Sequence, residues 1–536
     1  MPDLEFIQAL QSGLRPDNRT NRNSQLLVQM QGLIPTEWGA KALPEFVYPI
    51  TGTPTQSVAH PFPQMVQVAG QLMLWFQTAL YKINEDDWTD TNVATATYNP
   101  GTPGSTLAIS AGGELWQFAG FQQGTYFATN GQSLIYEMPS NDILSGTTRK
   151  AYNAETTVLC RAIANHQDRL VLGGLSGTHF STTPGSDWDN LWEAWRENAP
   201  ENIVVSDDET IGLNYILYSE QSGGDADIPF ATIMAALGQP DSATYDKLLP
   251  IILGYIEQGK MGLYPIRTSE TIHAMKEHNG DLIVYGDKSV SRLSMGEVII
   301  NGRVAAGYRE QVLLDQGIAG RGCVGGDDST HVFVTNHGEL YRLRAGEGLE
   351  RLGYSEFIFP LVDTSAEAAK TLIAFDPSER FYWITNGVNG FCLTRTGLGG
   401  CDDIMPISVL RNPKYPSALI GTGTVAGSPG GATIETEIFD GEKRSAWEIA
   451  YVDISTTDTD ATGWQLAPRY RLNKADALVT KAAETFDQRG RVRTKTPGID
   501  HALLLTAADR TKVDLERIFV LEGQGKLSLR DLHNTV

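Results

Sequence analysis

The chain has 536 residues, and its 42 lysines and arginines against 64 aspartates and glutamates give a formal net charge of −22. This acidic balance argues against a protein that holds nucleic acid by neutralising its phosphates, because that function needs a basic surface. Hydrophobic residues make up 41% of the sequence, which is enough to form large cores and excludes disorder of the whole chain. The length predicts about two to four domains, or fewer if the fold is all-β.

Membrane and secretory signals are missing from the sequence. No run approaches about 18 consecutive apolar residues, and the first 30 residues contain no charged segment followed by an apolar one. The four cysteines have no CxxC spacing, which predicts reduced, buried thiols. We therefore expect a soluble, non-secreted protein made in a reducing cytoplasm.

Residues 1–50 are predicted to form an N-terminal arm. A short helical stretch, Leu4 to Leu10, precedes an extended run and three prolines. Trp38, Phe46 and Tyr48 lie among these prolines, and rigid aromatic side chains often anchor interfaces. They are candidate contacts to a partner ring, while packing of the arm on its own β domain is an equally good interpretation.

Residues 51–420 show the spacing of successive β-hairpins. Within residues 104–136, four short apolar runs alternate with glycine turns, and one turn is Asn130-Gly131, the strongest short hairpin signal. The same pattern returns around Arg169, around Asp281, where a turn at Asn279-Gly280 precedes the apolar run, and around His331. Repeats of a four-stranded antiparallel unit predict an all-β fold, a β-propeller whose number of blades the irregular spacing leaves open.

Two segments depart from this pattern. Residues 228–260 change to a 3.6-residue period and predict a small helical insertion of two short helices. The Gly-rich segment Gly421 to Gly431 has Ser428-Pro-Gly where a nucleotide-binding helix would have to start, so it is interpreted as a linker. The apolar runs of residues 432–536 then predict a C-terminal β-sandwich.

No catalytic or cofactor motif stands out. The histidines lack the spacing of a helical zinc site, the Asp-Asp turns lack the spacing of a calcium loop, and no GxSxG segment is present. The segment Ser181 to Trp188 resembles the aspartate box of sialidase-type propellers, with Thr183 in place of the aspartate, but that box is a folded turn. We predict no cofactor, no metal and no enzyme activity.

One basic strand contrasts with the acidic background. The run Arg489 to Lys495 alternates in type, and period-2 alternation places Arg491, Arg493 and Lys495 on one face of a strand. A solvated sheet face that discourages edge-to-edge aggregation is one interpretation. A contact to an acidic neighbouring subunit is the other.

Several of these repeated strand-and-turn segments resemble segments of a known protein family. The segments Arg169 to Asn190, Asp281 to Leu293, Gln316 to Val324 and His331 to Tyr341 are similar in kind and order to the blades of tail nozzle and tail hub proteins of short-tailed bacteriophages, also called packaged-DNA stabilisation proteins. The resemblance covers about residues 160–395. The helical segment Leu248 to Lys260 departs from the family pattern.

The resemblance implies a structural protein of the virion tail, made in the host cytoplasm. Such proteins form a ring, commonly of six copies, that extends the channel of the portal and adaptor proteins, retains packaged DNA and guides its ejection. An acidic channel lets DNA slide without sequence-specific binding. The alternative is a propeller that binds or cleaves glycans in the tail, which predicts two facing carboxylates at one mouth of the propeller.

Overall fold

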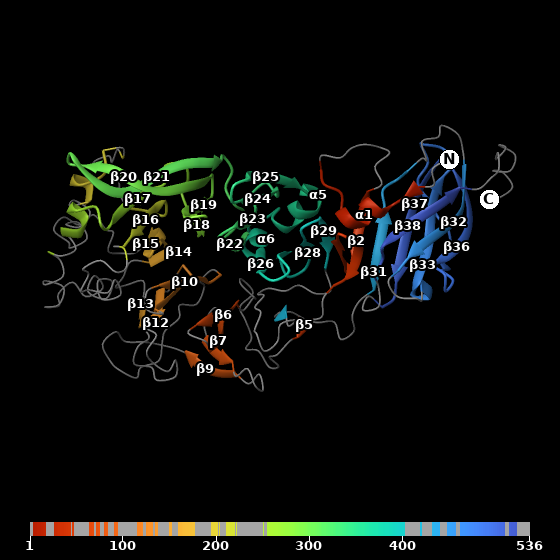
Figure 1. Cartoon of the computed structure of the whole chain (residues 1–536), viewed down its shortest axis with the longest axis horizontal. Coiled ribbons are helices and arrows are strands. Elements are labelled where there is room, and N and C mark those ends of the chain that lie inside the picture. Colours follow the sequence, from red (N-terminus) through yellow and green to blue (C-terminus); the bar gives the residue numbers. More distant parts are fainter. Residues whose placement is uncertain are drawn as a thin grey trace. The chain divides into compact units, whose positions relative to one another are not determined.

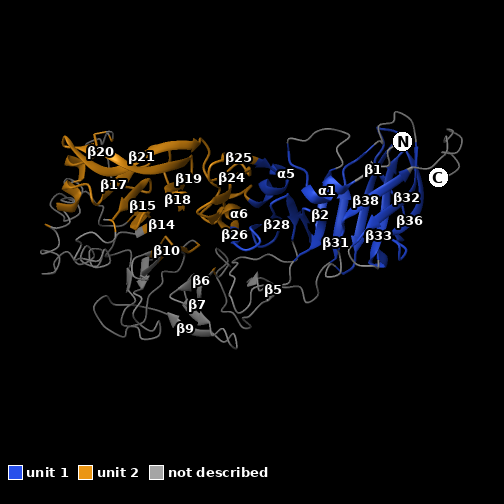
Figure 2. Ribbon diagram, in the orientation of Figure 1, with its two compact units in different colours: residues 1–48, 352–361, 373–536 blue, residues 49–351, 362–372 orange. Residues whose placement is uncertain are grey.

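The computed structural model describes residues 4–17, 26–43, 46–47, 64–68, 71–75, 80–83, 90–94, 115–121, 125–131, 134–137, 150–152, 159–176, 195–201, 203, 211–219, 221, 250, 254–401, 419–420, 431–439, 447–456, 461–509 and 514–522. The fold is mostly β and contains several four-stranded antiparallel sheets (Figure 1). Contacts divide the chain into unit 1, residues 1–48, 352–361 and 373–536, and unit 2, residues 49–351 and 362–372 (Figure 2). This division differs from the predicted segments 1–50, 51–420 and 432–536.

Unit 2 contains sheets in which four consecutive strands pair in chain order. The first two sheets are β6 (Gln64–Val68) to β9 (Asp90–Ala94), through β7 (Gln71–Trp75) and β8 (Leu80–Ile83), and β10 (Gln117–Phe121) to β13 (Lys150–Tyr152), through β11 (Thr125–Thr129) and β12 (Leu134–Glu137). The next two are β14 (Leu159–His166), β15 (Arg169–Ser176), β16 (Tyr215–Tyr218) and β17 (Gly262–Pro265), then β18 (Ile272–His278), β19 (Asp281–Gly286), β20 (Val290–Ile300) and β21 (Arg303–Leu314). The last comprises β22 (Val324–Asp327), β23 (Thr330–Val334), β24 (Leu340–Arg344) and β25 (Gly348–Gly353).

The predicted hairpin turns recur in these sheets. Asn279 and Gly280 join β18 to β19 with φ of 51° and 83°, the left-handed pair that a tight two-residue turn requires. Strands β10, β11 and all but the last residue of β12 lie within residues 104–136, where four antiparallel strands were predicted. The fourth strand of the sheet is β13, which follows that segment. The run predicted as the first strand, residues 106–110, lies outside the described residues.

Neighbouring sheets of unit 2 are joined through their first strands and first turns. Strand β14 packs between β10 and β18. Asn165 Nδ2 donates to Gly120 O at 3.0 Å, Gln167 Nε2 donates to Gly280 O at 2.9 Å, and Asn279 N donates to Asp328 O at 2.9 Å. These bonds run from one sheet to the next, so each first turn supports its neighbour.

Two buried histidines bridge sheets in the same way. His166 Nδ1 lies 2.9 Å from Tyr308 Oη and its Nε2 lies 2.9 Å from Gly280 O, while His331 Nδ1 lies 2.7 Å from Tyr285 Oη and its Nε2 lies 3.0 Å from Glu277 O. Burial, reinforced by Lys276 and His278, lowers the pKa of His331 to about 3. A neutral ring donates from Nε2 and accepts at Nδ1, which matches both environments.

The apolar core of unit 2 lies beneath these polar bridges. Val171, Ile216, Leu282 and Leu293 are fully buried and come from four different strands. Tyr308 joins them, with its ring edge-on to Tyr218 at 5.2 Å. Alternating apolar residues on the facing strands therefore form one continuous cluster.

Three short helical elements follow β25, and the first two belong to unit 1. They are α5 (Ser355–Ile358), the 3₁₀ turn η3 (Phe359–Leu361) and α6 (Ser365–Lys370). Of the predicted insertion at residues 228–260, the structure describes residue 250 and residues 254–260, where residues 254–257 form a helical turn. No described helix is long and apolar enough to cross a membrane.

Unit 1 contains a large sheet in which an N-terminal strand joins two C-terminal sets. Its order is β26 (Leu372–Asp376), β27 (Phe381–Thr385), β28 (Gly390–Leu393), β29 (Leu398–Gly400), β2 (Leu27–Gln31), β31 (Ala432–Thr436), β37 (Asp500–Ala507), β33 (Trp464–Arg471) and β34 (Val479–Thr480), with β35 (Glu484–Thr485) also on β33. Strand β2 is parallel to β29 and antiparallel to β31. Residues distant in sequence therefore form one sheet.

A second sheet of unit 1 has the order β1 (Leu4–Glu5), β38 (Arg517–Glu522), β32 (Trp447–Ser455) and β36 (Arg491–Gly498). It faces the large sheet, because the ring of Trp447 lies edge-on to His501 of β37 with centroids 4.4 Å apart. Burial lowers the pKa of His501 to about 4. Smaller elements are the 3₁₀ turn η4 (Ala461–Gly463) and the pairs β3 (Leu33–Thr36) with β4 (Gly39–Ala42) and β5 (Phe46–Val47) with β30 (Leu419–Ile420).

The described part of the predicted N-terminal arm belongs to unit 1. Helix α1 (Ile7–Ser12) buries Ala9 and Leu10, and the preceding Phe6 packs edge-on against Phe439 at 5.3 Å. Together with β1 and β2, this segment supplies core residues and sheet hydrogen bonds. It is thus a structural part of unit 1 over the residues described.

Candidate functional site: a basic face on unit 1

The predicted alternation of the basic strand is present in β36. Arg491, Arg493 and Lys495 are exposed, whereas Val492 and Thr494 between them are buried. The buried residues face the large sheet, so the charged residues cover the outer side of the smaller sheet. The sequence pattern therefore placed these three side chains on one face, while their role as an interface stays a prediction.

Two arginines of this strand lie against one tyrosine. Arg491 makes a two-pronged ion pair with Asp453 of β32, from Nε to Oδ1 and from Nη2 to Oδ2, both at 2.8 Å. The guanidinium groups of Arg491 and Arg493 lie 5.8 and 5.7 Å from the ring centre of Tyr451. Hydrogen bonds to Asp453 raise the pKa of Arg491. The ring and the carboxylate thus orient both cations.

Lys495 occupies an irregular position at the other end of the row. The pairing of β32 with β36 shifts register between Ile449 and Tyr451, and Lys495 has a φ of 45°, in the left-handed region. A bulge of this kind bends a strand and redirects a side chain. The local irregularity therefore sets the direction of Lys495.

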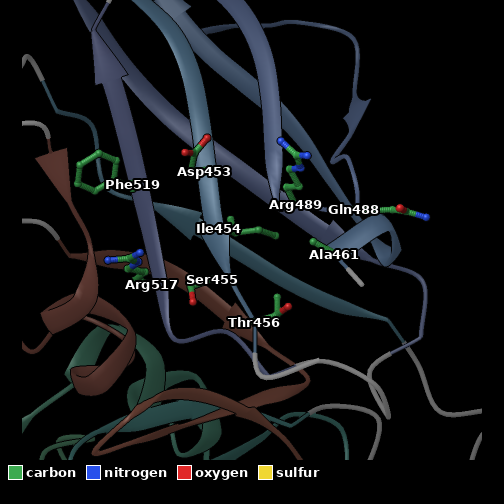
Figure 3. A pocket seen from close by; sticks show the side chains of 10 residues that line it. Asp453, Ile454, Ser455, Thr456, Ala461, Gln488, Arg489, Arg517 and Phe519 are labelled. Atoms are coloured by element: carbon green, nitrogen blue, oxygen red, sulfur yellow. The ribbon is translucent and has the colours of Figure 1, made fainter. Parts of the chain in front are cut away.

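A cavity of about 410 Å³ adjoins these residues (Figure 3). Its walls include Arg489 from the turn before β36, Arg517 and Phe519 from β38, and Asp453 and Ser455 from β32. Pairing of Asp453 with both Arg491 and Phe519, and of Ser455 with Arg517, puts these positions on the same side of the sheet.

We call this surface the basic face and define it as Arg489, Arg491, Arg493, Lys495 and Arg517. All five residues are exposed, and Asp453 between them is engaged by Arg491. In a chain with a net charge of −22, such a face attracts acidic surfaces. Sequence inspection missed Tyr451, Asp453 and Arg517, although the alternation along their strands was a usable signal.

The predicted aromatic contacts lie elsewhere in unit 1 or outside the description. Trp38 is 76% exposed in the turn between β3 and β4, where Trp38 N donates to Thr36 Oγ1 at 3.3 Å. Ala40, two residues later, pairs with Leu515, which precedes β38. Phe46 is the first residue of β5, and the structure describes its main chain only. Tyr48 lies outside the described residues.

Among the described residues, no group of three or more histidine, cysteine, aspartate or glutamate side chains is arranged to hold a metal ion. The aspartate-box segment, residues 181–188, lies outside the described residues, as does most of the glycine-rich linker. The arrangement of the basic face suits binding of an acidic surface.

No family model matches the sequence, and no curated protein matches it either. Among solved structures, the chain is similar to the WD40 domain of Pan2 from Neurospora crassa, with a TM-score of 0.33 and 8% identity over 70% of this chain and 88% of that one. It is also similar to an exo-β-1,3-galactanase from Phanerochaete chrysosporium solved with galactose, with a TM-score of 0.22 and 10% identity over 88% of this chain and 84% of that one. At these TM-scores neither likeness carries an argument about function.

Proposed function

We propose that this chain is a structural protein that assembles with copies of itself into a ring through the basic face. The observation that carries the proposal is the exposure of five basic residues on one side of a sheet in a strongly acidic chain. Copies of such a chain repel one another except where this face meets an acidic surface. Charge complementarity then fixes which surfaces meet.

The same argument favours a ring over a simple two-fold dimer. In a two-fold interface residue i of one subunit contacts residue j of the other and j contacts i, so the basic face and its acidic partner patch would have to lie within one self-complementary surface. A basic face meeting a different, acidic patch gives a head-to-tail contact. Head-to-tail contacts close into rings when the rotation between subunits allows.

We further propose that the four-stranded sheets are blades of a β-propeller and that the paired sheets of unit 1 form the predicted β-sandwich. Adjacency of the first strands β10, β14 and β18, with bonds between the first turns, is what blades around an axis require. In the proposed ring, these propellers and sandwiches of neighbouring copies would lie side by side.

The resemblance to tail hub and tail nozzle proteins gives the ring its proposed place. We assign the protein to the tail of a short-tailed bacteriophage, where a ring of about six copies contacts adaptor or portal proteins and surrounds the DNA path. Its acidity would keep DNA mobile in the channel during retention and ejection. No catalytic step is part of this proposal.

Mass measurement with charge-reversed variants tests the proposal. By mass photometry, the wild-type protein is expected at a discrete multiple near six chains, alone or on isolated tails. The variant Arg491→Glu/Arg493→Glu/Lys495→Glu should be monomeric. The control Arg303→Glu/Arg395→Glu/Lys474→Glu changes the net charge equally at exposed positions outside the basic face and should still form rings.

Two results would count against the ring. One is a charge-reversed variant that assembles as well as the control. The other is a wild-type monomer that does not bind isolated tails in low salt but binds or cleaves a glycan. That result would favour the alternative, a glycan-binding or glycan-cleaving propeller. Raising the salt to about 1 M should dissociate rings held by exposed charges, because the screening length falls to about 3 Å.

A further inference from the structure

A second cavity, of about 450 Å³, lies wholly within unit 2 and is independent of the basic face. It is found where the strands β14 and β18 meet the loop before β22 and the segment around α6. Its polar lining comes from Arg161, His273, Arg321, Asn336, Asp363, Thr364 and Ser365. Two guanidinium groups therefore share one concave site with a single aspartate from this set.

Arg161 is positioned by a glycine on the neighbouring strand. Gly174 of β15 has a φ of +66°, and a Cβ atom there would come within 2.9 Å of Arg161 Cβ and 3.1 Å of Ile272 O. The missing side chain leaves room for the stem of Arg161 next to β18. The close approach of β15 to β18 thus directs Arg161 along the cavity wall.

Arg321, which also lines the cavity, is held in place by the fold. Its side chain is 7% exposed, and Nη2 donates to Thr129 O at 2.6 Å. The loop that carries it is pressed against α6, because a Cβ atom on Gly320 would lie 2.5 Å from Ala368 O. Cys323 N donates to Gly320 O at 3.0 Å and closes the turn. Arg321 therefore has little freedom to leave the cavity.

His273 and Thr364 are fixed as well. Gln117 Nε2 donates to His273 O at 2.9 Å and joins β10 to β18 at the cavity. Thr364 caps α6, since its Oγ1 accepts a hydrogen bond from Glu367 N at 3.2 Å. Hydrogen bonds thus support the main chain of His273 and the side chain of Thr364 in the polar lining.

We propose that this cavity binds a small ligand through an oxyanion, either a carboxylate or a phosphate, held by Arg161 and Arg321. Guanidinium groups match these anions with paired hydrogen bonds, and rigid support lowers the cost of binding. The volume falls within the range of about 300–1,000 Å³ that is usual for small-molecule sites. His273, Asn336 and Thr364 offer further polar contacts.

Calorimetric titration of the full-length protein with inorganic phosphate and, separately, with citrate tests this site at low ionic strength. Arg161→Gln should weaken binding about tenfold, the loss expected for a charge-assisted hydrogen bond. Asp363→Asn removes the one carboxylate of this polar lining and should strengthen binding about threefold. Arg303→Gln, which removes an exposed charge from the same unit outside the cavity, should bind as the wild type does.

The two probes separate the possible sources of the oxyanion, since a phosphate site and a polycarboxylate site rank them in opposite order. Arg321→Gln should also weaken binding. Because Arg321 is buried, this variant can fail to fold, and in that case the stronger binding expected for Asp363→Asn still tests the proposal. Failure of both anions to bind at about 10 mM would overturn the proposal. Equal binding by Arg161→Gln and Arg303→Gln would also overturn it, because it would show only general ionic attraction.

Discussion

Two arginines of unit 2 and two arginines of unit 1 have different surroundings. In unit 2, Arg169 and Arg321 are each 7% exposed and donate to main-chain carbonyls, Arg169 to Ser219 O at 2.9 Å and Lys260 O at 2.7 Å. In unit 1, Arg491 and Arg493 are exposed over Tyr451. The comparison teaches that burial, and not charge, separates arginines that bond main-chain carbonyls inside the fold from arginines exposed to another protein chain.

Arg169→Leu should have the largest effect on stability. The substitution leaves two carbonyls in a largely buried site without their donor, which costs about 3 kcal/mol in the free energy of unfolding. Urea unfolding checks this value. The control Arg303→Leu, at an exposed position in the same unit, should stay within about 0.5 kcal/mol of wild type, and equal losses in both variants would remove the distinction drawn from burial.

His331 predicts a pH dependence for unit 2. Its pKa is lowered to about 3 in the folded protein, so the unfolded chain binds more protons between pH 6.5 and pH 3. The stabilising effect of the neutral ring is complete above pH 6.5 and is lost as the pH falls toward 3. The expected slope is about 1.4 kcal/mol per pH unit within that window.

Urea unfolding from pH 6 to pH 4 measures this slope. His331→Gln cannot titrate, yet offers a donor for Glu277 O and an acceptor for Tyr285 Oη, so its slope should be reduced by the contribution of one proton. His337→Gln, which removes an exposed histidine from a nearby turn, should keep the wild-type slope. Identical slopes in all three proteins would contradict a neutral bridging histidine.

The smallest change in stability is expected for Arg491→Ala. An exposed ion pair contributes little to folding, so the urea midpoint should stay at the wild-type value. Assembly should nevertheless weaken if the basic face is an interface. Urea unfolding measures the stability of this variant and mass photometry measures its assembly. A large loss of stability without any loss of assembly would show that Arg491 stabilises the fold and does not contact a partner.

Local sequence signals predicted part of this fold well. The turn at Asn279-Gly280 and the alternation through β36 depend on neighbouring residues, and both are present. The position of β2 was not predictable in this way, because its partners β29 and β31 lie hundreds of residues away and strand pairing depends on register. The compact units therefore differ from the segments drawn from composition.

The candidate site shows the same limit. Arg491, Arg493 and Lys495 follow from period-2 alternation on one strand, whereas Tyr451 and Arg517 join them only through pairing across strands. The cavity lined by Arg161 and Arg321 was missed altogether. Arg161 and Arg321 are 160 positions apart in the numbering, and no local pattern links them.

The strand β2 also has a consequence for how the protein is made. It lies between β29 and β31, so its hydrogen-bonding partners leave the ribosome some 370 to 400 residues later. Unit 2 can fold during synthesis while the first strands of unit 1 wait without partners, exposing edges that invite aggregation. A chaperone that covers the nascent N-terminal segment would therefore raise the yield of folded chains. Removal of residues 1–31 would leave β29 and β31 without β2, and β38 without β1, in the finished protein.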